Sequence, residues 1–293
     1  MTFVSEEIES QPELWRRATA LAAEQAAVLP EPGARVAVFG CGTSLYVAQS
    51  IAAAREMASH GETDAFPASE MPLGRRYDLA VALSRSGTTT EVVELTRRLR
   101  EGTPVLAITA QPDGPLADLA TRVIAMEFAD EQSVVQTRFA TCTVALLRAH
   151  LGEDLEQAIA DGERALRAPL PVDPGELRQL VFLGRAASVG LAHEAALKVR
   201  EGAQAWSEAY PAMEYRHGPI SVADEGTVAW ALEPLPAGLE DEITATGATV
   251  VNPQGDPLAE LVRAQRFAVE LARARGLDPD RPRNLTRSVV LGG

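Results

Sequence analysis

The chain has 293 residues, with 27 Lys and Arg against 41 Asp and Glu, which gives a formal net charge of −14. So acidic a chain repels phosphate backbones and anionic lipid surfaces, and these charges exclude nucleic acids and membranes from the expected partners. A small phosphorylated ligand stays compatible with this charge. Salt screens the long-range repulsion from the net negative charge, so a local cluster of N–H and O–H donors is enough to bind a phosphate.

The cysteines and the amino terminus bear on cofactors and location. Two cysteines, Cys41 and Cys142, make no disulfide framework, and no Cys/His spacing is typical of a metal site. We therefore expect neither a metal nor another cofactor. Residues 1–9 carry three glutamates where a signal peptide needs positive charge, and no apolar stretch reaches the roughly 18 residues of a membrane span. The sequence predicts a cytoplasmic protein.

The first half of the chain predicts an α/β fold. An amphipathic helix is expected at 12–29, after which apolar runs alternate with helical stretches. The runs predict strands at 35–39, 79–83, 105–108 and 123–126. Helices are expected at 44–58, 90–100, 115–120 and 135–150. Nearly continuous apolar strands that alternate with helices indicate a parallel sheet covered on both faces.

A proline-rich segment at 168–175 predicts a connection between two domains, 1–168 and 169–293. Beyond it, strands are expected at 180–183, 227–232 and 248–251, and a helix at 258–275. An internal repeat favours two domains. In each half a predicted strand ends in glycine (Gly40, Gly184), and a serine follows four residues later (Ser44, Ser188).

The turn at 40–44, Gly-Cys-Gly-Thr-Ser, joins the first predicted strand to a helix. Glycine lets the backbone approach a ligand closely, and the helix start offers unpaired N–H groups, to which Thr43 and Ser44 add hydroxyls. A tight turn with a Ser or Thr N-cap explains the same residues, so both interpretations stay open. A nicotinamide-dependent oxidoreductase is disfavoured, because the dinucleotide fingerprint needs glycine where Leu45 stands.

The turn at 84–91, Ser-Arg-Ser-Gly-Thr-Thr-Thr-Glu, carries five hydroxyls and a guanidinium between a strand end and a helix start. In open parallel sheets, ligands bind in the crevices at the carboxyl ends of neighbouring strands, where this turn is expected to lie. We therefore expect the hydroxyls of this turn and the guanidinium of Arg85 to hold a phosphate. A merely polar loop is the alternative. The turn lacks Gly-Lys-Ser/Thr, which excludes a Walker loop.

The second half carries a candidate acid–base group. On the predicted helix, Glu194, Lys198 and Glu201 are four and then three residues apart and share one face. A surface stripe of ion pairs is the alternative for these three. His217 precedes Gly-Pro, where irregular backbone is expected. A carboxylate such as Glu201 and an imidazole such as His217 suit the proton shuttling of a sugar isomerisation.

Taken together, these residues resemble the double sugar-isomerase (SIS) domain proteins, over nearly the whole chain and in order. The two turns carry the resemblance, with the Glu-x-x-Leu-Lys-x-x-Glu helix that ends at Glu201 and the segments 208–211, 217–219 and 280–285. The chain is similar to the isomerase half of the glutamine–fructose-6-phosphate aminotransferases, whose start resembles residues 7–12. The resemblance implies two αβα sandwich domains with parallel sheets.

The resemblance also implies roles. It implies contacts with phosphate and sugar for Ser44, Ser84, Ser86 and Thr89. The stretch 131–137, which contains Val134, resembles a sugar-contacting connection. Glu201 matches the base that moves a proton between C1 and C2, and Lys198 matches a lysine near the substrate. His217 matches a ring-opening histidine that reaches into the neighbouring subunit's site, so a homodimer with shared active sites is implied.

Three departures from the family pattern matter. Met1-Thr2 offers no N-terminal cysteine nucleophile, so we expect no glutaminase domain in this chain. Arg287 stands where the aminotransferases have an imine-forming lysine; a guanidinium forms no Schiff base at physiological pH and suits a carboxylate or phosphate instead. The second domain is expected to be shortened, because the chain passes from Pro257 directly into its final helix.

Two functions follow. The first is an enzyme that isomerises a hexose or hexosamine 6-phosphate by proton transfer between C1 and C2, with or without release of ammonia. The second is a phosphosugar-binding sensor without catalysis, which Arg287 and the shortened domain favour. Because a sensor needs no acid–base residues, Glu201 and His217 favour the enzyme.

Overall fold

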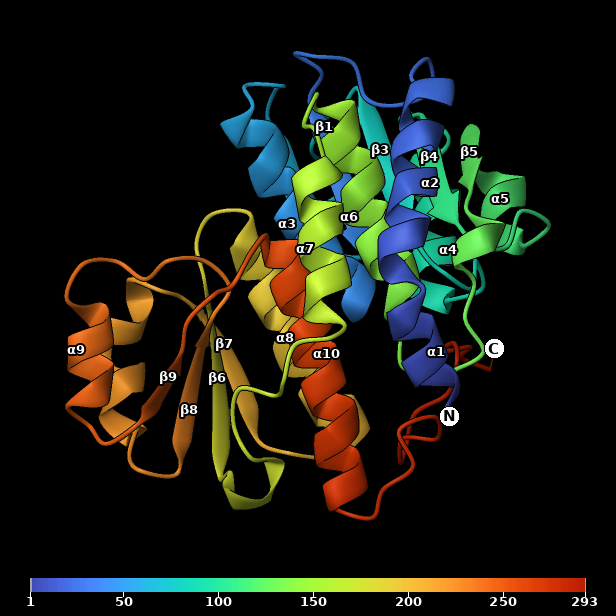
Figure 1. Ribbon diagram of the computed structural model, residues 1–293. Helices are drawn as coiled ribbons and strands as arrows, with labels where there is room; N and C mark the ends of the chain where they lie inside the picture. Colours follow the sequence, from blue (N-terminus) through green and yellow to red (C-terminus); the bar gives the residue numbers. More distant parts are fainter. Residues whose placement is uncertain (1, 293) are drawn as a thin grey trace. The chain divides into compact units, whose positions relative to one another are not determined.

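The structure, a computed structural model, describes residues 2–292 (Figure 1). It divides into two compact units, each built on its own parallel sheet, which confirms the predicted α/β architecture. The first-sheet unit comprises Glu13–Gln132, Gln136–Leu155 and the segment from Thr286 onward. The second-sheet unit comprises the described residues up to Pro12, Ser133–Val135 and Glu156–Leu285. The domain boundary at residue 168 stays a prediction.

The first-sheet unit follows the predicted alternation of strands and helices. Its strands are β1 (Val36–Gly40), β2 (Thr63–Pro67), β3 (Leu79–Leu83), β4 (Val105–Thr109) and β5 (Arg122–Ala125). Its helices are α2 (Gln11–Glu24), α3 (Thr43–Met57), α4 (Thr90–Leu99), α5 (Pro115–Leu119), the 3₁₀ turn η1 (Glu127–Ala129) and α6 (Arg138–His150).

The order of the first sheet is β2-β1-β3-β4-β5, all parallel. From β1 the chain crosses first to β2 on one side and then to β3 on the other. The carboxyl ends of β1 and β3 therefore flank the switch point at which doubly wound sheets bind their ligands. Alternate strand residues such as Phe39 and Ala107 pack with α4 and α5 on one face, and α3 packs with α6 on the other (Figure 1).

The second-sheet unit repeats this plan with fewer strands. Its strands are β6 (Gln179–Gly184), β7 (Ser207–Pro211), β8 (Thr227–Ala231) and β9 (Thr249–Val251). Its helices are α1 (Phe3–Glu9), α7 (Glu156–Ala165), α8 (Ser188–Ala203), α9 (Leu239–Thr244) and α10 (Pro257–Ala274). Its 3₁₀ turns are η2 (Pro174–Glu176), η3 (Glu214–His217) and η4 (Pro219–Val222).

The order of the second sheet is β7-β6-β8-β9, again parallel, so β6 and β8 occupy the places that β1 and β3 hold in the first. Leu239 and Ile243 of α9 join the apolar cluster on one face. On the other side Trp230 packs against Phe267 of α10, with ring centroids 5.8 Å apart. The predicted repeat thus corresponds to two sheets with the same winding.

Two helix boundaries differ from the predictions by more than one residue. Helix α2 ends at Glu24 instead of residue 29, and the chain then passes through turns toward Pro30. Helix α6 begins at Arg138 instead of residue 135, because the Glu131 carboxylate accepts hydrogen bonds from the amides of Thr137 and Arg138 and so caps the helix there.

Candidate functional site

The turn after β1 is compact because Gly40 has no side chain. An added Cβ would lie 2.5 Å from the Cβ of Ser44 and 3.1 Å from the carbonyl oxygen of Leu83 at the end of β3. Gly42 holds a positive φ of 54° as the N-cap of α3 and makes no side-chain cap bond. Thr43 and Ser44 are buried in the first turn of α3 and do not act as its N-cap, so the N-cap alternative is wrong. Their position suits the phosphate-binding interpretation.

The turn after β3 folds back on itself through its own hydroxyls. The Gly87 amide donates to Ser84 Oγ at 3.2 Å, and the Thr88 amide donates to Ser86 Oγ at 3.3 Å. Gly87 has a positive φ of 64°, a backbone conformation that glycine adopts readily. The hydroxyls of Ser86, Thr88 and Thr89 thereby gather at the start of α4, whose N-cap Thr89 makes no side-chain cap bond.

Arg85 is buried, with its side chain 0% exposed. Its guanidinium pairs with the buried carboxylate of Glu131 at 3.5 Å and donates to the carbonyl oxygen of Arg287 at 2.8 Å. Arg85 was predicted as a phosphate ligand, and that role stays a prediction; its contacts place it as a link between the turn, Glu131 and the last residues of the chain. The sequence offered no local signal for this link.

The tail of the chain lies on the turn after β3. Ser288 Oγ accepts hydrogen bonds from Thr88 Oγ1 at 2.9 Å and Ser86 Oγ at 3.1 Å. Arg287 forms an ion pair with Asp130, and its side chain is 42% exposed. Thr88 and Ser288 were not among the predicted site residues, because their contact spans 200 positions of the sequence.

A buried ionic group occupies α8 in the second-sheet unit. Lys198 Nζ lies 3.2 Å from Glu194 Oε1 and 2.6 Å from Glu201 Oε2. The surface-stripe alternative is wrong, because Glu194 and Lys198 are buried and only Glu201 is partly exposed, with 20% of its side chain accessible. Burial alone would lower the pKa of Lys198, but the two carboxylates outweigh it and the pKa is raised. Lys198 therefore stays charged and fixes the Glu201 carboxylate.

His217 and Val134 lie elsewhere in the second-sheet unit. His217 is exposed at the end of η3, so the expectation of irregular backbone was wrong; the run Glu214–His217 forms a single 3₁₀ turn before Gly218. Within the part of the chain that the structure describes, no hydrogen bond joins His217 to Glu201. Val134 is half-buried, and its neighbour Ser133 is held by the carboxylate of Glu7.

Seven of the predicted binding residues belong to the first-sheet unit. Six lie at the carboxyl edge of its sheet, and the seventh, Arg287, lies on the tail beside them. The seven are Thr43, Ser44, Ser84, Arg85, Ser86, Thr89 and Arg287. The predicted catalytic residues Lys198, Glu201 and His217 belong to the other unit, with Val134. Their approach to the hydroxyl-lined turn stays a prediction.

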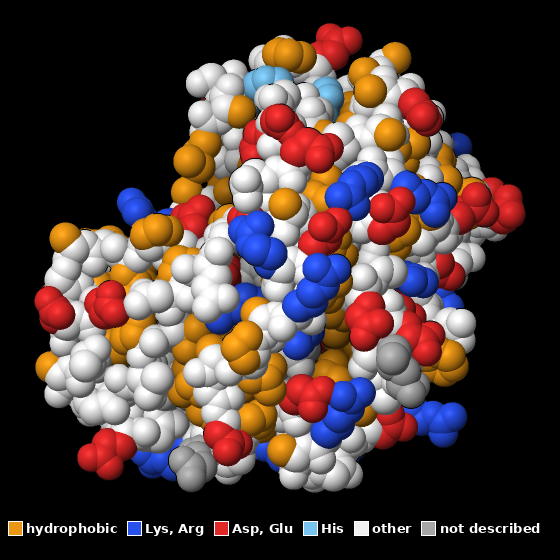
Figure 2. All heavy atoms as spheres, viewed as in Figure 1, with side chains coloured by type: hydrophobic (Ala, Val, Ile, Leu, Met, Phe, Trp, Pro, Cys, Tyr) orange, Lys and Arg blue, Asp and Glu red, His pale blue; other side chains and the backbone are white. Residues whose placement is uncertain are grey.

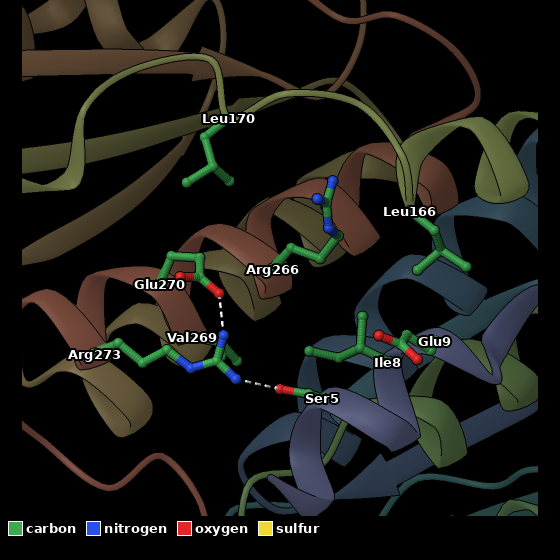
Figure 3. A pocket seen from close by; sticks show the side chains of 9 residues that line it. All are labelled: Ser5, Ile8, Glu9, Leu166, Leu170, Arg266, Val269, Glu270 and Arg273. Atoms are coloured by element: carbon green, nitrogen blue, oxygen red, sulfur yellow. Dashed lines mark hydrogen bonds and ion pairs between the residues drawn. The ribbon is translucent and has the colours of Figure 1, made fainter. Parts of the chain in front are cut away.

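A cavity of about 560 Å³ lies within the second-sheet unit (Figure 3). Ile8, Leu166 and Val269 give it apolar walls. Its arginines already have partners, since Arg273 binds Glu270 and Ser5 and points between them, and Arg266 donates to backbone carbonyls. None of the predicted site residues is among the described residues that line it, so we do not assign it to the site.

On the face in Figure 2, acidic and basic side chains are interspersed over the surface. Among the described residues no helix is long and apolar enough to cross a bilayer. Within residues 2–292, no three His, Cys, Asp or Glu side chains are grouped so that they could hold a metal ion.

Comparison with known proteins agrees with this α/β fold. Residues 31–150, which include β1 to β5 and both turns, match the family described as SIS domain. The predicted resemblance to SIS proteins is confirmed.

Individual proteins and solved structures are similar to this chain over most of its length. The chain is 27% identical over 318 residues to the isomerizing glutamine–fructose-6-phosphate aminotransferase of Tropheryma whipplei, which covers 88% of this chain and 52% of that protein. The chain spans about half the length of the curated relatives it matches. The glucosamine-6-phosphate deaminase of Thermotoga maritima superposes with a TM-score of 0.82 at 25% identity, covering 98% of this chain and 100% of that one. The C-terminal domain of the Francisella tularensis aminotransferase shares the fold, with a TM-score of 0.77 at 19% identity over 96% of this chain and 98% of that one.

Proposed function

We propose that the chain is a sugar-phosphate isomerase that acts on a hexose or hexosamine 6-phosphate. The observation that carries this proposal is the hydroxyl-lined turn after β3, next to β1 at the switch point of the sheet. Hydroxyls and helix-start amides bind a phosphate dianion without adding positive charge, which suits a chain with a net charge of −14. The similarity to a glutamine–fructose-6-phosphate aminotransferase and to a glucosamine-6-phosphate deaminase supports a hexose or hexosamine 6-phosphate as the substrate class.

Glu201 is the proposed base. A carboxylate that removes the proton from the carbon beside a carbonyl and returns it to the neighbouring carbon interconverts aldose and ketose. The 2.6 Å contact with Lys198 holds Glu201 in one orientation, and its partly exposed side chain is open to a ligand. In this scheme Lys198 is a positioning residue, and Glu201 is the catalytic residue.

His217 is the proposed ring-opening group, acting in a site shared between the subunits of a homodimer. Its exposure at the end of η3 is compatible with such a position. With a hexosamine phosphate, the same proton shift yields an imine at C2. Water then adds to this carbon and ammonia leaves, so isomerisation and deamination differ only in the group that C2 carries. The shortened second domain, proposed here from its four strands against five in the first sheet, would leave this site more open.

The test is an assay of the purified chain with a panel of hexose and hexosamine 6-phosphates, detecting ketose and ammonia separately. We expect turnover with at least one of them and a loss of about a hundredfold or more in Glu201→Gln, as removal of a general base produces. The matched control is Glu225→Gln, a surface carboxylate in the same unit, which should retain full activity. No turnover with any sugar, or full activity in Glu201→Gln, would defeat the proposal.

The second candidate is a phosphosugar sensor, which the ion pair between Arg287 and Asp130 favours. A guanidinium in that position performs no imine chemistry, and it is already engaged. Thermal stabilisation by a sugar phosphate, in the absence of any product over long incubation, would establish the sensor in place of the enzyme.

A further inference from the structure

His217 stands at the end of η3 without side-chain support of its own. Its imidazole is exposed and makes no hydrogen bond or ion pair within residues 2–292. Gly218 follows it directly and ends the turn with a φ of 136°, a conformation that favours glycine. An acid–base group must lie within hydrogen-bond reach of the proton that it moves. The direction in which His217 points therefore depends on how the backbone of its turn is held.

The residue before the histidine holds this turn from one side. Arg216 Nε donates to Glu242 Oε2 at 2.7 Å, and Nη2 donates to the carbonyl oxygen of Ala237 at 2.8 Å. Nη1 donates to the sulfur of Met213, at the start of the same turn, at 3.2 Å. Every nitrogen of this planar guanidinium thus has a partner, and a rotation of the side chain would break more than one bond.

The partners of Arg216 belong to an element that is itself fixed. Ala237 lies just before α9, and Glu242 lies within this helix. Leu239 and Ile243, both 0% exposed, bury the other side of α9 in the apolar cluster of the second sheet. Arg216 therefore connects the turn that carries His217 to a helix that cannot shift without disturbing the core.

Tyr215 holds the same turn from the other side. Its side chain is buried in the apolar cluster of the second sheet, and its ring centroid lies 6.0 Å from that of Tyr210 in β7. The two residues before His217 are thus anchored, Tyr215 in the core and Arg216 on α9. Arg216 is the polar anchor, so it can be replaced without opening a cavity among apolar side chains.

We propose that Arg216 is the positioning residue of His217: by tying the turn Glu214–His217 to Glu242 and Ala237, it sets the direction in which the imidazole points. This inference rests on the proposed ring-opening role of His217. Arg216 touches no substrate in this scheme and acts through the histidine.

The first measurement is kcat/KM with the hexose or hexosamine 6-phosphate that the chain converts. Arg216→Met keeps the length of the side chain but removes its donors. We expect kcat/KM to fall about tenfold, because a displaced acid–base group loses much of its contribution. The loss should lie in kcat and not in KM, since Arg216 holds no group of the substrate. Arg216→Lys keeps the charge beside Glu242 but has no second nitrogen for Ala237, so we expect an intermediate loss of about threefold.

The matched control lies in the same unit. Arg178→Met breaks an exposed ion pair with Asp224, away from the turn that carries His217, and should retain full activity. Melting curves establish that each variant is folded.

A double-mutant cycle separates positioning from general support of the fold. His217→Ala should lower kcat/KM about a hundredfold, as loss of an acid–base group does. Adding Arg216→Met to His217→Ala should then cost less than about a further twofold, because the group that Arg216 positions is gone.

The outcomes of the cycle are distinct. A further tenfold loss in the His217→Ala background would overturn this inference and leave the proposed function standing. So would full activity of Arg216→Met beside an impaired His217→Ala. Full activity of His217→Ala, or no turnover of any sugar phosphate by the unaltered chain, would remove the proposed role of His217, and this inference with it.

Discussion

The ammonium of Lys198 lies 2.6 Å from Oε2 of Glu201 while its side chain is only 1% exposed. On its other side it pairs with Glu194, which is 0% exposed. Replacement by methionine keeps the apolar stem but removes the charge of Lys198 from beside the buried Glu194 carboxylate. We expect Lys198→Met to lower the free energy of unfolding by about 3–5 kcal/mol, measured by urea denaturation.

Two further variants test this explanation. Adding Glu194→Gln to Lys198→Met removes the uncompensated charge and should recover part of the lost stability. Arg97→Met breaks an exposed pair with Glu94 and should change the free energy of unfolding by less than about 1 kcal/mol. Equal effects of Lys198→Met and Arg97→Met would contradict the assignment of a buried ionic group.

Glu131 joins two parts of the first-sheet unit. One carboxylate oxygen caps α6 through the amides of Thr137 and Arg138, and the other pairs with Arg85. Glu131→Gln keeps the shape but leaves the buried guanidinium without its charge partner, so we expect a loss of about 3–5 kcal/mol in the free energy of unfolding. Glu153→Gln, in a partly exposed pair with Arg148, is the control and should cost less than about 1 kcal/mol. A similar cost for both would show that burial of the Arg85 pair does not matter.

The strands that the sequence failed to predict share a position in the fold. β2 and β7 each lie at the edge of their sheet, beside β1 and β6. Their sequences, Thr-Asp-Ala-Phe-Pro and Ser-Glu-Ala-Tyr-Pro, lack the apolar runs that predicted the central strands. An edge strand is less enclosed, so its residues need not be apolar, and the periodic signal is lost. Helix α1 was also missed: its N-cap Thr2 is local, but the amides of Phe3 and Val4 donate to Asp280, which comes from the far end of the sequence.

The candidate site was predictable where its chemistry is local. The turns after β1 and β3 combine glycines and hydroxyls within a few residues, and Glu194, Lys198 and Glu201 follow helical spacing. Their burial was not predictable, because it depends on what packs around α8. The contact of Ser288 with the turn has no local signal either, since no periodicity or motif links positions 88 and 288.

His150 gives the chain a pH-dependent contribution to stability. Burial lowers its pKa below the ordinary 6.5, although its hydrogen bond to the carbonyl of Pro30 opposes this shift. As the pH falls below about 6.5, the unfolded chain takes up this proton first, so stability decreases until the folded-state pKa is passed. His150→Gln should therefore lose less stability than the unaltered chain between about pH 7 and pH 5. Urea denaturation across this range measures the difference, and parallel slopes would contradict the assignment to His150.

Gly40 and Gly202 should respond in opposite directions to the same substitution. At Gly40 an added Cβ meets the Cβ of Ser44 at 2.5 Å and its backbone carbon at 2.9 Å, so either the strand end or the start of α3 must shift. We expect Gly40→Ala to lower the free energy of unfolding by about 1–3 kcal/mol. At Gly202, within α8, an added Cβ meets nothing within 4 Å, and alanine gains about 0.5–1 kcal/mol from its helix propensity. Thermal unfolding of both variants measures the contrast. A stabilising Gly40→Ala would contradict this explanation. It would mean that the close approach of β1 to α3, which places Ser44 beside the end of β3, tolerates a side chain at position 40.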